Sequence, residues 1–197
     1  MLKNYLMENY GYNEPIFLNE LSIKGISQNA IRQSMKRLAE NGVLERYDNG
    51  IYYIPKNGGV LEKSYLDPSM VVMRKYVKNK SEQFGYITGL SFANQLGLTT
   101  QMAAVVEVVT NRESTNGRFV MVGKQKVRVK KSIIQISESN AELLQLLDGI
   151  TQAEKYTELT INETVEILTA YIRRKKFTQK QLSDVSAALT GGTAKKL

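Results

Sequence analysis

The chain has 197 residues and a mass of 22.2 kDa, and its 42% hydrophobic and 23% charged residues fit one or two compact globular domains. It contains neither Cys nor His, which excludes thiol nucleophiles, Ser-His-Asp triads and zinc sites built from those ligands. Lys and Arg outnumber Asp and Glu by 27 to 19, and the net charge of +8 favours polyanionic partners.

No stretch of the sequence predicts membrane insertion. Residues 1–5 lack an apolar signal core. The most apolar later run, 103–106, is interrupted by Glu107, far short of the roughly 20 apolar residues that a membrane helix requires. We therefore expect a soluble, cytoplasmic protein without membrane contact.

Three helices are predicted in the first 57 residues. Apolar side chains at helical spacing run to Tyr10, and Gly11 ends this first helix. A second, short helix spans residues 18–22. Ser27 then occupies a favourable N-cap position, and Asn41-Gly42 ends a third helix of about 14 residues.

The third helix is amphipathic, and the chemistry of its polar half indicates a binding role. Ile31, Met35 and Leu38 share one side, whereas the other side carries Asn, Gln, Arg and Lys. Asn, Gln and Arg can form paired hydrogen bonds to base edges in the DNA major groove, and Lys contacts phosphates. The candidate DNA contacts on this helix are Gln28, Asn29, Arg32, Gln33, Lys36 and Arg37.

Two strand-like runs, 43–47 and 51–54, flank Asn49-Gly50, which is the strongest short signal for a β-hairpin. Three helices followed by a hairpin are the order of a winged helix-turn-helix, whose third helix enters the major groove while the wing contacts the backbone or minor groove. Arg46 and Asn49 are the candidate contacts of this wing. The alternative is a protein-interaction module in which the third helix is merely solvated.

A domain boundary is predicted at residues 55–59, where a proline and paired glycines follow the second strand. Beyond it, Asp67-Pro68 begins a helix that extends to about Asn79. Its predicted inward side chains are Met70, Met73 and Val77. An extended segment and a short helix that ends at Gly97 come next. Strands are expected at residues 103–110, 117–122 and 125–131, with another beginning at Ile133-Ile134.

The strand at 125–131 carries a basic ridge. Its candidate residues are Lys124, Lys126, Arg128, Lys130 and Lys131. Because side chains alternate along a strand, the first four lie on one face. Residues 58–135 hold twelve basic and five acidic residues, against seven and six before residue 58. The ridge is expected to meet either the DNA backbone or an acidic partner protein.

A purely structural alternative for the ridge is an edge strand whose lysines prevent aggregation. No aromatic residue is interleaved with these cations, which disfavours a stacking platform for single-stranded nucleic acid.

Helices make up the C-terminal part. One is predicted at residues 140–147 and ends at Gly149, and capping boxes at residues 160–163 and 178–181 begin two more.

The predicted fold class for the whole chain is α+β. Residues 1–57 form a winged helix-turn-helix DNA-binding domain. Residues 58–197 form a mixed α/β domain with a small antiparallel sheet and C-terminal helices.

The chain resembles the AbiEi-type antitoxins of bacterial abortive-infection toxin-antitoxin systems, which are also transcriptional regulators. The resemblance covers most of the chain and rests on GVLER at 42–46, NGIY at 49–52, YITGLSFA at 86–93 and LGLT at 96–99. It implies an antitoxin for phage defence in which Asn29, Arg32, Gln33 and Lys36 contact bases and phosphates. Two copies would bind inverted-repeat double-stranded DNA in the protein's own promoter and repress the operon, an autoregulation. The domain at 58–197 would counteract a nucleotidyltransferase-like toxin, directly or indirectly.

Two other functions compete with this one. The first is a protein-binding module that neutralises an acidic partner through the basic ridge without sequence-specific DNA binding. The second, a phosphoryl-transferring enzyme, is disfavoured because the sequence has no G-x-x-x-x-G-K phosphate loop and no convergent set of carboxylates. We therefore predict no catalytic residues, no metal site and no cofactor.

Overall fold

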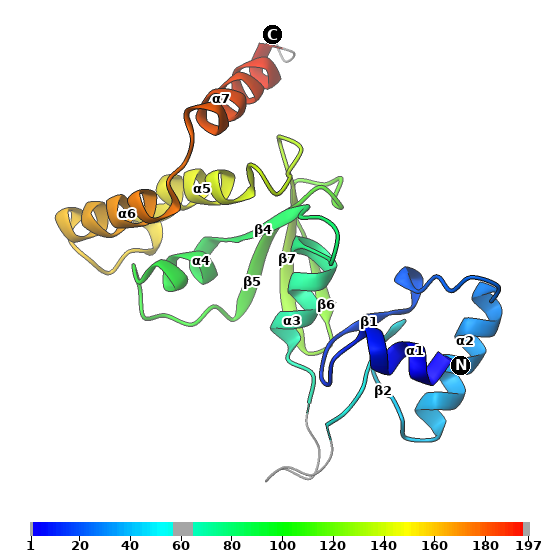
Figure 1. The fold of residues 1–197 in the computed structure, drawn as a ribbon. Helices are drawn as coiled ribbons and strands as arrows, with labels where there is room; N and C mark the ends of the chain where they lie inside the picture. Colours follow the sequence, from blue (N-terminus) through cyan, green and yellow to red (C-terminus); the bar gives the residue numbers. More distant parts are fainter. Residues whose placement is uncertain (1, 57–64, 195–197) are drawn as a thin grey trace. The chain divides into compact units, whose positions relative to one another are not determined.

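The structure, a computed structural model, describes residues 2–56 and 65–194 and the side chains as far as residue 189 (Figure 1). Contacts divide the chain into two compact units, Met1–Val72 with Val122–Lys124, and Met73–Met121 with Gln125–Leu197. The boundary predicted at residue 57 adjoins residues 57–64, which lie outside the described part. The predicted α+β class is confirmed, since each unit combines helices with a small sheet.

The first unit contains the predicted helices and hairpin together with one additional strand. Its elements are α1 (Leu2–Asn9), β1 (Ile16–Phe17), η1 (Leu18–Glu20), α2 (Gln28–Glu40), β2 (Glu45–Asp48) and β3 (Ile51–Tyr53), followed by α3 (Pro68–Val72). The strands form an antiparallel sheet in the order β1-β3-β2. The predicted second helix is only the single 3-10 turn of η1, because Leu21 already has extended backbone angles.

Helix α2 begins and ends where the sequence predicts. The Ser27 hydroxyl accepts the backbone N–H of Ala30 at 3.3 Å, which satisfies one of the free donors in the first turn. Gly42 has φ +69° after the last turn, a conformation that favours glycine. Ile31 and Met35 are fully buried in the core of the first unit, so the apolar side of α2 is fixed in place.

The predicted β-hairpin is confirmed. Strands β2 and β3 pair antiparallel, and Gly50 has φ +72° in the turn that joins them. The register shifts between Arg46 and Asp48, which indicates a bulge close to the hairpin tip.

The helix predicted from Asp67 to Asn79 is shorter and changes type. Helix α3 gives way to the π-helical turn η2 (Met73–Val77). Because a π-turn holds more residues than an α-turn, it rotates the later side chains around the axis. Met70 is exposed, Met73 is only half-buried and Val77 is buried, so only the last of the three predicted inward positions is correct.

The second unit is built on a four-stranded sheet in the order β4-β5-β7-β6. Its strands are β4 (Gly85–Thr88), β5 (Val105–Thr110), β6 (Arg118–Val122) and β7 (Gln125–Lys131). Strand β4 runs antiparallel to β5, but β5 runs parallel to β7, so the sheet is mixed and the prediction of an antiparallel sheet is wrong. The strand predicted at Ile133-Ile134 does not form; these residues lie in a bend, and Ile133 is 84% exposed.

Four α-helices accompany this sheet in the described part of the chain, in addition to the π-helical turn η2. They are α4 (Gly89–Leu96), α5 (Ala141–Tyr156), α6 (Ile161–Lys175) and α7 (Gln179–Ala194). Both predicted capping boxes form, at Thr160 with Glu163 and at Thr178 with Gln181.

The helix predicted to end at Gly149 instead continues through this residue to Tyr156. A Cβ at Gly149 would lie 2.7 Å from Cε1 of the buried Phe92 ring on α4. Glycine at this position therefore allows α5 and α4 to approach closely, and it does not act as a stop signal.

Candidate nucleic-acid interfaces

The polar side of α2 is open to solvent. All six candidate residues of this helix are exposed or half-buried, while the apolar residues behind them are buried. These are Gln28, Asn29, Arg32, Gln33, Lys36 and Arg37. The buried anchors Ile31 and Met35 hold the helix axis, so this surface presents its hydrogen-bonding groups on a rigid support.

Two of these residues are engaged within the protein. The Gln28 amide nitrogen donates to the Leu21 carbonyl at 2.8 Å, which ties the start of α2 to the preceding segment. Lys36 lies 3.8 Å from the Glu40 carboxylate in a solvent-exposed pair of little energetic weight. Within the described part of the chain, Asn29, Arg32, Gln33 and Arg37 make no such side-chain contact and are available to a ligand.

The candidate wing residues shape the tip of the hairpin. Arg46 donates from Nε to the Asp48 carbonyl at 3.3 Å and from Nη2 to the Asn49 side-chain oxygen at 3.1 Å. The backbone N–H of Asn49 donates to the Asp48 carboxylate at 2.7 Å. Both hydrogen bonds of Arg46 lie at the exposed surface, and its guanidinium keeps further N–H donors for a phosphate.

Glu45 would repel DNA phosphates if its charge faced the wing surface. The Tyr53 hydroxyl donates to its carboxylate at 2.7 Å, which holds this charge against β3. Burial, together with this hydrogen bond and the charge of Glu45, raises the pKa of Tyr53, so the hydroxyl remains a donor at neutral pH.

The basic ridge lies on an interior strand of the sheet. Strand β7 has neighbours on both sides, so the edge-strand explanation for its lysines is wrong. Val127 and Val129 are fully buried on one face, and Lys126, Arg128 and Lys130 alternate onto the other. Of the remaining predicted members, Lys124 lies in the turn before the strand, and alternation places Lys131 on the face opposite to Lys130.

Glu107 on β5, which is not among the predicted site residues, partly neutralises this ridge. Its carboxylate lies 2.6 Å from Lys130 Nζ and 3.5 Å from Arg128 Nη1. Burial alone would raise the pKa of Glu107, but the hydrogen bond and charge of Lys130 and the charge of Arg128 lower it below its ordinary value. One signal in the sequence could have identified this residue, because Glu107 is the only charged side chain between residues 103 and 110.

An aromatic residue joins the ridge from the neighbouring strand. The Phe119 ring on β6 lies 4.6 Å from Lys126 Nζ and 6.0 Å from Arg128 Cζ, both within the range of cation-π interactions. Phe119 is 60% exposed and Met121, two residues further along β6, is 56% exposed. Although the sequence of β7 itself contains no aromatic residue, the folded surface therefore places one beside its cations.

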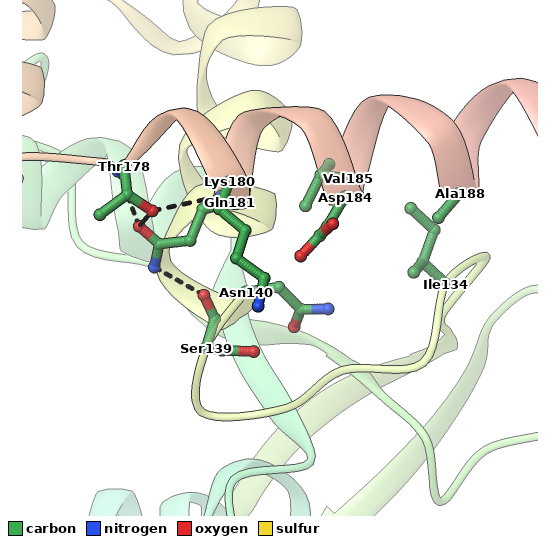
Figure 2. Close-up of a pocket in the computed structure, with 9 residues that line it drawn as sticks. All are labelled: Ile134, Ser139, Asn140, Thr178, Lys180, Gln181, Asp184, Val185 and Ala188. Carbon is green, nitrogen blue, oxygen red and sulfur yellow. Dashed lines mark hydrogen bonds between the residues drawn. The ribbon is translucent and has the colours of Figure 1, made fainter.

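A pocket of about 390 Å³ lies between α7 and the segment that leads into α5 (Figure 2). The side chain of Gln181 already forms hydrogen bonds with two other lining residues. Its amide nitrogen donates to the Ser139 carbonyl at 2.7 Å, and its amide oxygen accepts the backbone N–H of Thr178. The charged lining residues Lys180 and Asp184 are exposed.

Two features are absent from the described residues. They contain no group of three or more Asp or Glu side chains placed to hold a metal ion. No helix among them is both long enough and apolar enough to cross a membrane.

Comparison with known protein families places most of the chain in one family. The model of a protein family described as a family of unknown function, DUF6088, matches residues 13–178. A search of curated proteins finds no significant match.

Proposed function

We propose that this chain, which belongs to the DUF6088 family of unknown function, is a non-enzymatic repressor and antitoxin that binds double-stranded DNA through α2. The observation that carries the proposal is the polar side of α2, where Asn29, Arg32 and Gln33 form no side-chain hydrogen bond or ion pair with another described residue and lie over a buried apolar side. These are the side-chain types that read base edges in the major groove.

The element order of the first unit supports a winged helix-turn-helix in this proposal. Helices α1, η1 and α2 precede the β2-β3 hairpin, and the short strand β1 completes the sheet against β3. In such a domain the third helix enters the major groove and the hairpin contacts the flanking backbone. Arg46 and Asn49 at the tip would supply that contact.

The antitoxin role rests on the resemblance of the sequence to AbiEi-type antitoxins. We propose that two copies bind inverted repeats in the promoter of their own operon in the cytoplasm. The second unit would counteract a nucleotidyltransferase-like toxin.

The test is an electrophoretic mobility shift with the DNA upstream of the protein's own gene and with a scrambled duplex of equal length. We expect the protein to bind the upstream DNA more tightly than the scrambled duplex. Arg32→Ala should weaken this binding by about 1–3 kcal/mol and relax the base preference, because it removes a base-reading donor. Arg173→Ala, an exposed arginine on α6 in the second unit, is the matched control and should bind like the parent protein. Equal affinity for both duplexes would reject sequence-specific repression.

A further inference from the structure

We infer that the open face of β6 and β7 in the second unit binds single-stranded nucleic acid, with one base stacked on Phe119 and adjacent phosphates on the cations of β7. The site consists of Phe119, Met121, Lys126, Arg128 and Lys130. It includes none of the residues that we propose for duplex reading on α2, and the inference does not depend on the proposed repressor function.

Helix α5 covers only the β4-β5 half of this face of the sheet. Tyr86 and Val109, which are paired in the register of these strands, pack in one core with Leu143 and Leu144 of α5. Thr88 donates to Asp148 of the same helix at 3.0 Å. Thr88 pairs with Glu107, and Glu107 pairs with Arg128, so their side chains share this face. Beyond Arg128 the face continues to the exposed side chains of β6.

The exposed apolar groups favour an unpaired base as the ligand. Phe119 and Met121 stand side by side on one strand and leave more than half of each residue's surface in water. Exposed aromatics on a strand stack with bases that are splayed out of a helix, and each stacked base contributes about 1–3 kcal/mol. The bases of a duplex are already stacked on one another, so a duplex cannot use this ring.

The charge of the face complements a phosphate backbone. Lys126, Arg128 and Lys130 supply three positive charges against the single carboxylate of Glu107. Lys126 has no acidic partner among the residues that the structure describes, and its ammonium lies beside the Phe119 ring. A phosphate next to a stacked base would therefore meet a cation that none of the described carboxylates neutralises.

Tryptophan fluorescence tests the stacking step directly. The chain contains no Trp, so Phe119→Trp places the only indole at this position. We expect saturable quenching of its emission when the full chain is titrated with a 12-residue oligothymidine or oligouridine, and the comparison of the two distinguishes DNA from RNA. Ile161→Trp, at an exposed position on α6 of the same unit, is the control and should not be quenched. If neither oligomer quenches the Phe119→Trp variant in a saturable manner, the inference is overturned.

A second variant separates stacking from charge. Phe119→Ala should weaken oligothymidine binding, measured by fluorescence anisotropy, by about fivefold to hundredfold. Phe119→Ala should leave the affinity for duplex DNA unchanged. Arg32→Ala should weaken duplex binding and leave oligothymidine binding unchanged. The two proposals can therefore be rejected independently of each other. Circular dichroism confirms that the variant is folded. If polyglutamate quenches the indole as strongly as the oligomers do, the face binds acidic protein and the inference is wrong.

Discussion

Glu113 is a buried carboxylate whose charge is held by local donors. Its side chain is only 3% exposed, and Arg118 Nε lies 2.6 Å from it. The carboxylate also accepts the backbone N–H groups of Ser114 and Thr115 and the Thr115 hydroxyl. Burial acts to raise the pKa of Glu113, but these hydrogen bonds outweigh it and lower the pKa to about 2.

This shift predicts acid sensitivity. The pKa of Glu113 is lower in the folded state than its ordinary value of 4.5, so its stabilisation is complete above pH 4.5 and is lost as the pH falls towards 2. We expect Glu113→Gln to lower the free energy of unfolding in urea at pH 7, with the difference from the parent shrinking across that interval. Glu138→Gln, at a position outside the buried core, is the control. A difference that stays constant from pH 7 to pH 2 would contradict the assignment.

The exposed candidate residues could be predicted from the sequence, whereas the ion pairs of the ridge could not. The polar side of α2 follows from helical spacing, and the single face shared by Lys126 and Lys130 follows from strand alternation. Glu107 meets Lys130 only because β5 lies beside β7, a pairing between strands that are separated along the chain by β6. Nothing near Glu107 in the sequence indicates that neighbour.

Helix ends with local signals were predicted well. Ser27 and the capping boxes at Thr160 and Thr178 act within four residues, so the sequence contains all of their interactions. The misplaced end at Gly149 has a tertiary cause, because Phe92 packs against it from another helix. The missed strand β1 has only two residues, which is too short for any periodic pattern.

The close approach at Gly149 predicts that Ala is harmful there. An added methyl group would lie 2.7 Å from Cε1 and 3.0 Å from Cδ1 of Phe92. Phe92 is buried and packs edge-on against Tyr171, so its ring cannot move aside easily. We expect a net loss of about 1–3 kcal/mol in the free energy of unfolding, because overpacking exceeds the gain in helix propensity.

Chemical denaturation of a double-mutant cycle tests this cause. Phe92→Leu shortens the opposing side chain and relieves the crowding, so Gly149→Ala combined with Phe92→Leu should lose less stability than the sum of the two single changes. Additive losses would show that the methyl group does not meet Phe92.

At the scale of the whole molecule, the two nucleic-acid sites that we propose lie in parts of the chain with different net charge. Residues before 58 carry seven basic and six acidic side chains, whereas residues 58–135 carry twelve and five. A duplex site on the first unit would thus depend on a few well-placed cations, and the excess positive charge lies in the segment that includes β7.

Salt dependence distinguishes these two modes. The logarithm of affinity falls with the logarithm of salt concentration by about 0.9 per phosphate contact on duplex DNA and about 0.7 on single strands. We expect Arg37→Ala to reduce the salt dependence of duplex binding only, by about 0.9, which corresponds to one phosphate contact. Lys126→Ala should reduce the salt dependence of single-strand binding only. Anisotropy titrations over a series of salt concentrations measure both. A flatter duplex slope for Lys126→Ala would place the ridge on the duplex backbone.

Strand order was the part of the whole fold that the sequence could not provide. The α+β class, the positions of β5 to β7 and most helices follow from local patterns. The insertion of β7 between β5 and β6, which makes the sheet mixed, depends on which strands find each other in three dimensions.

This strand order has a consequence for synthesis on the ribosome. Strand β5 pairs with β4 as soon as both have emerged, but its other edge receives a partner only when β7 has been translated, after the whole of β6. Until then, one edge of this valine-rich strand remains unpaired on the nascent chain, and such an edge is a template for aggregation. Because a two-residue turn joins β6 and β7, they can dock as a preformed hairpin and close this edge in one step.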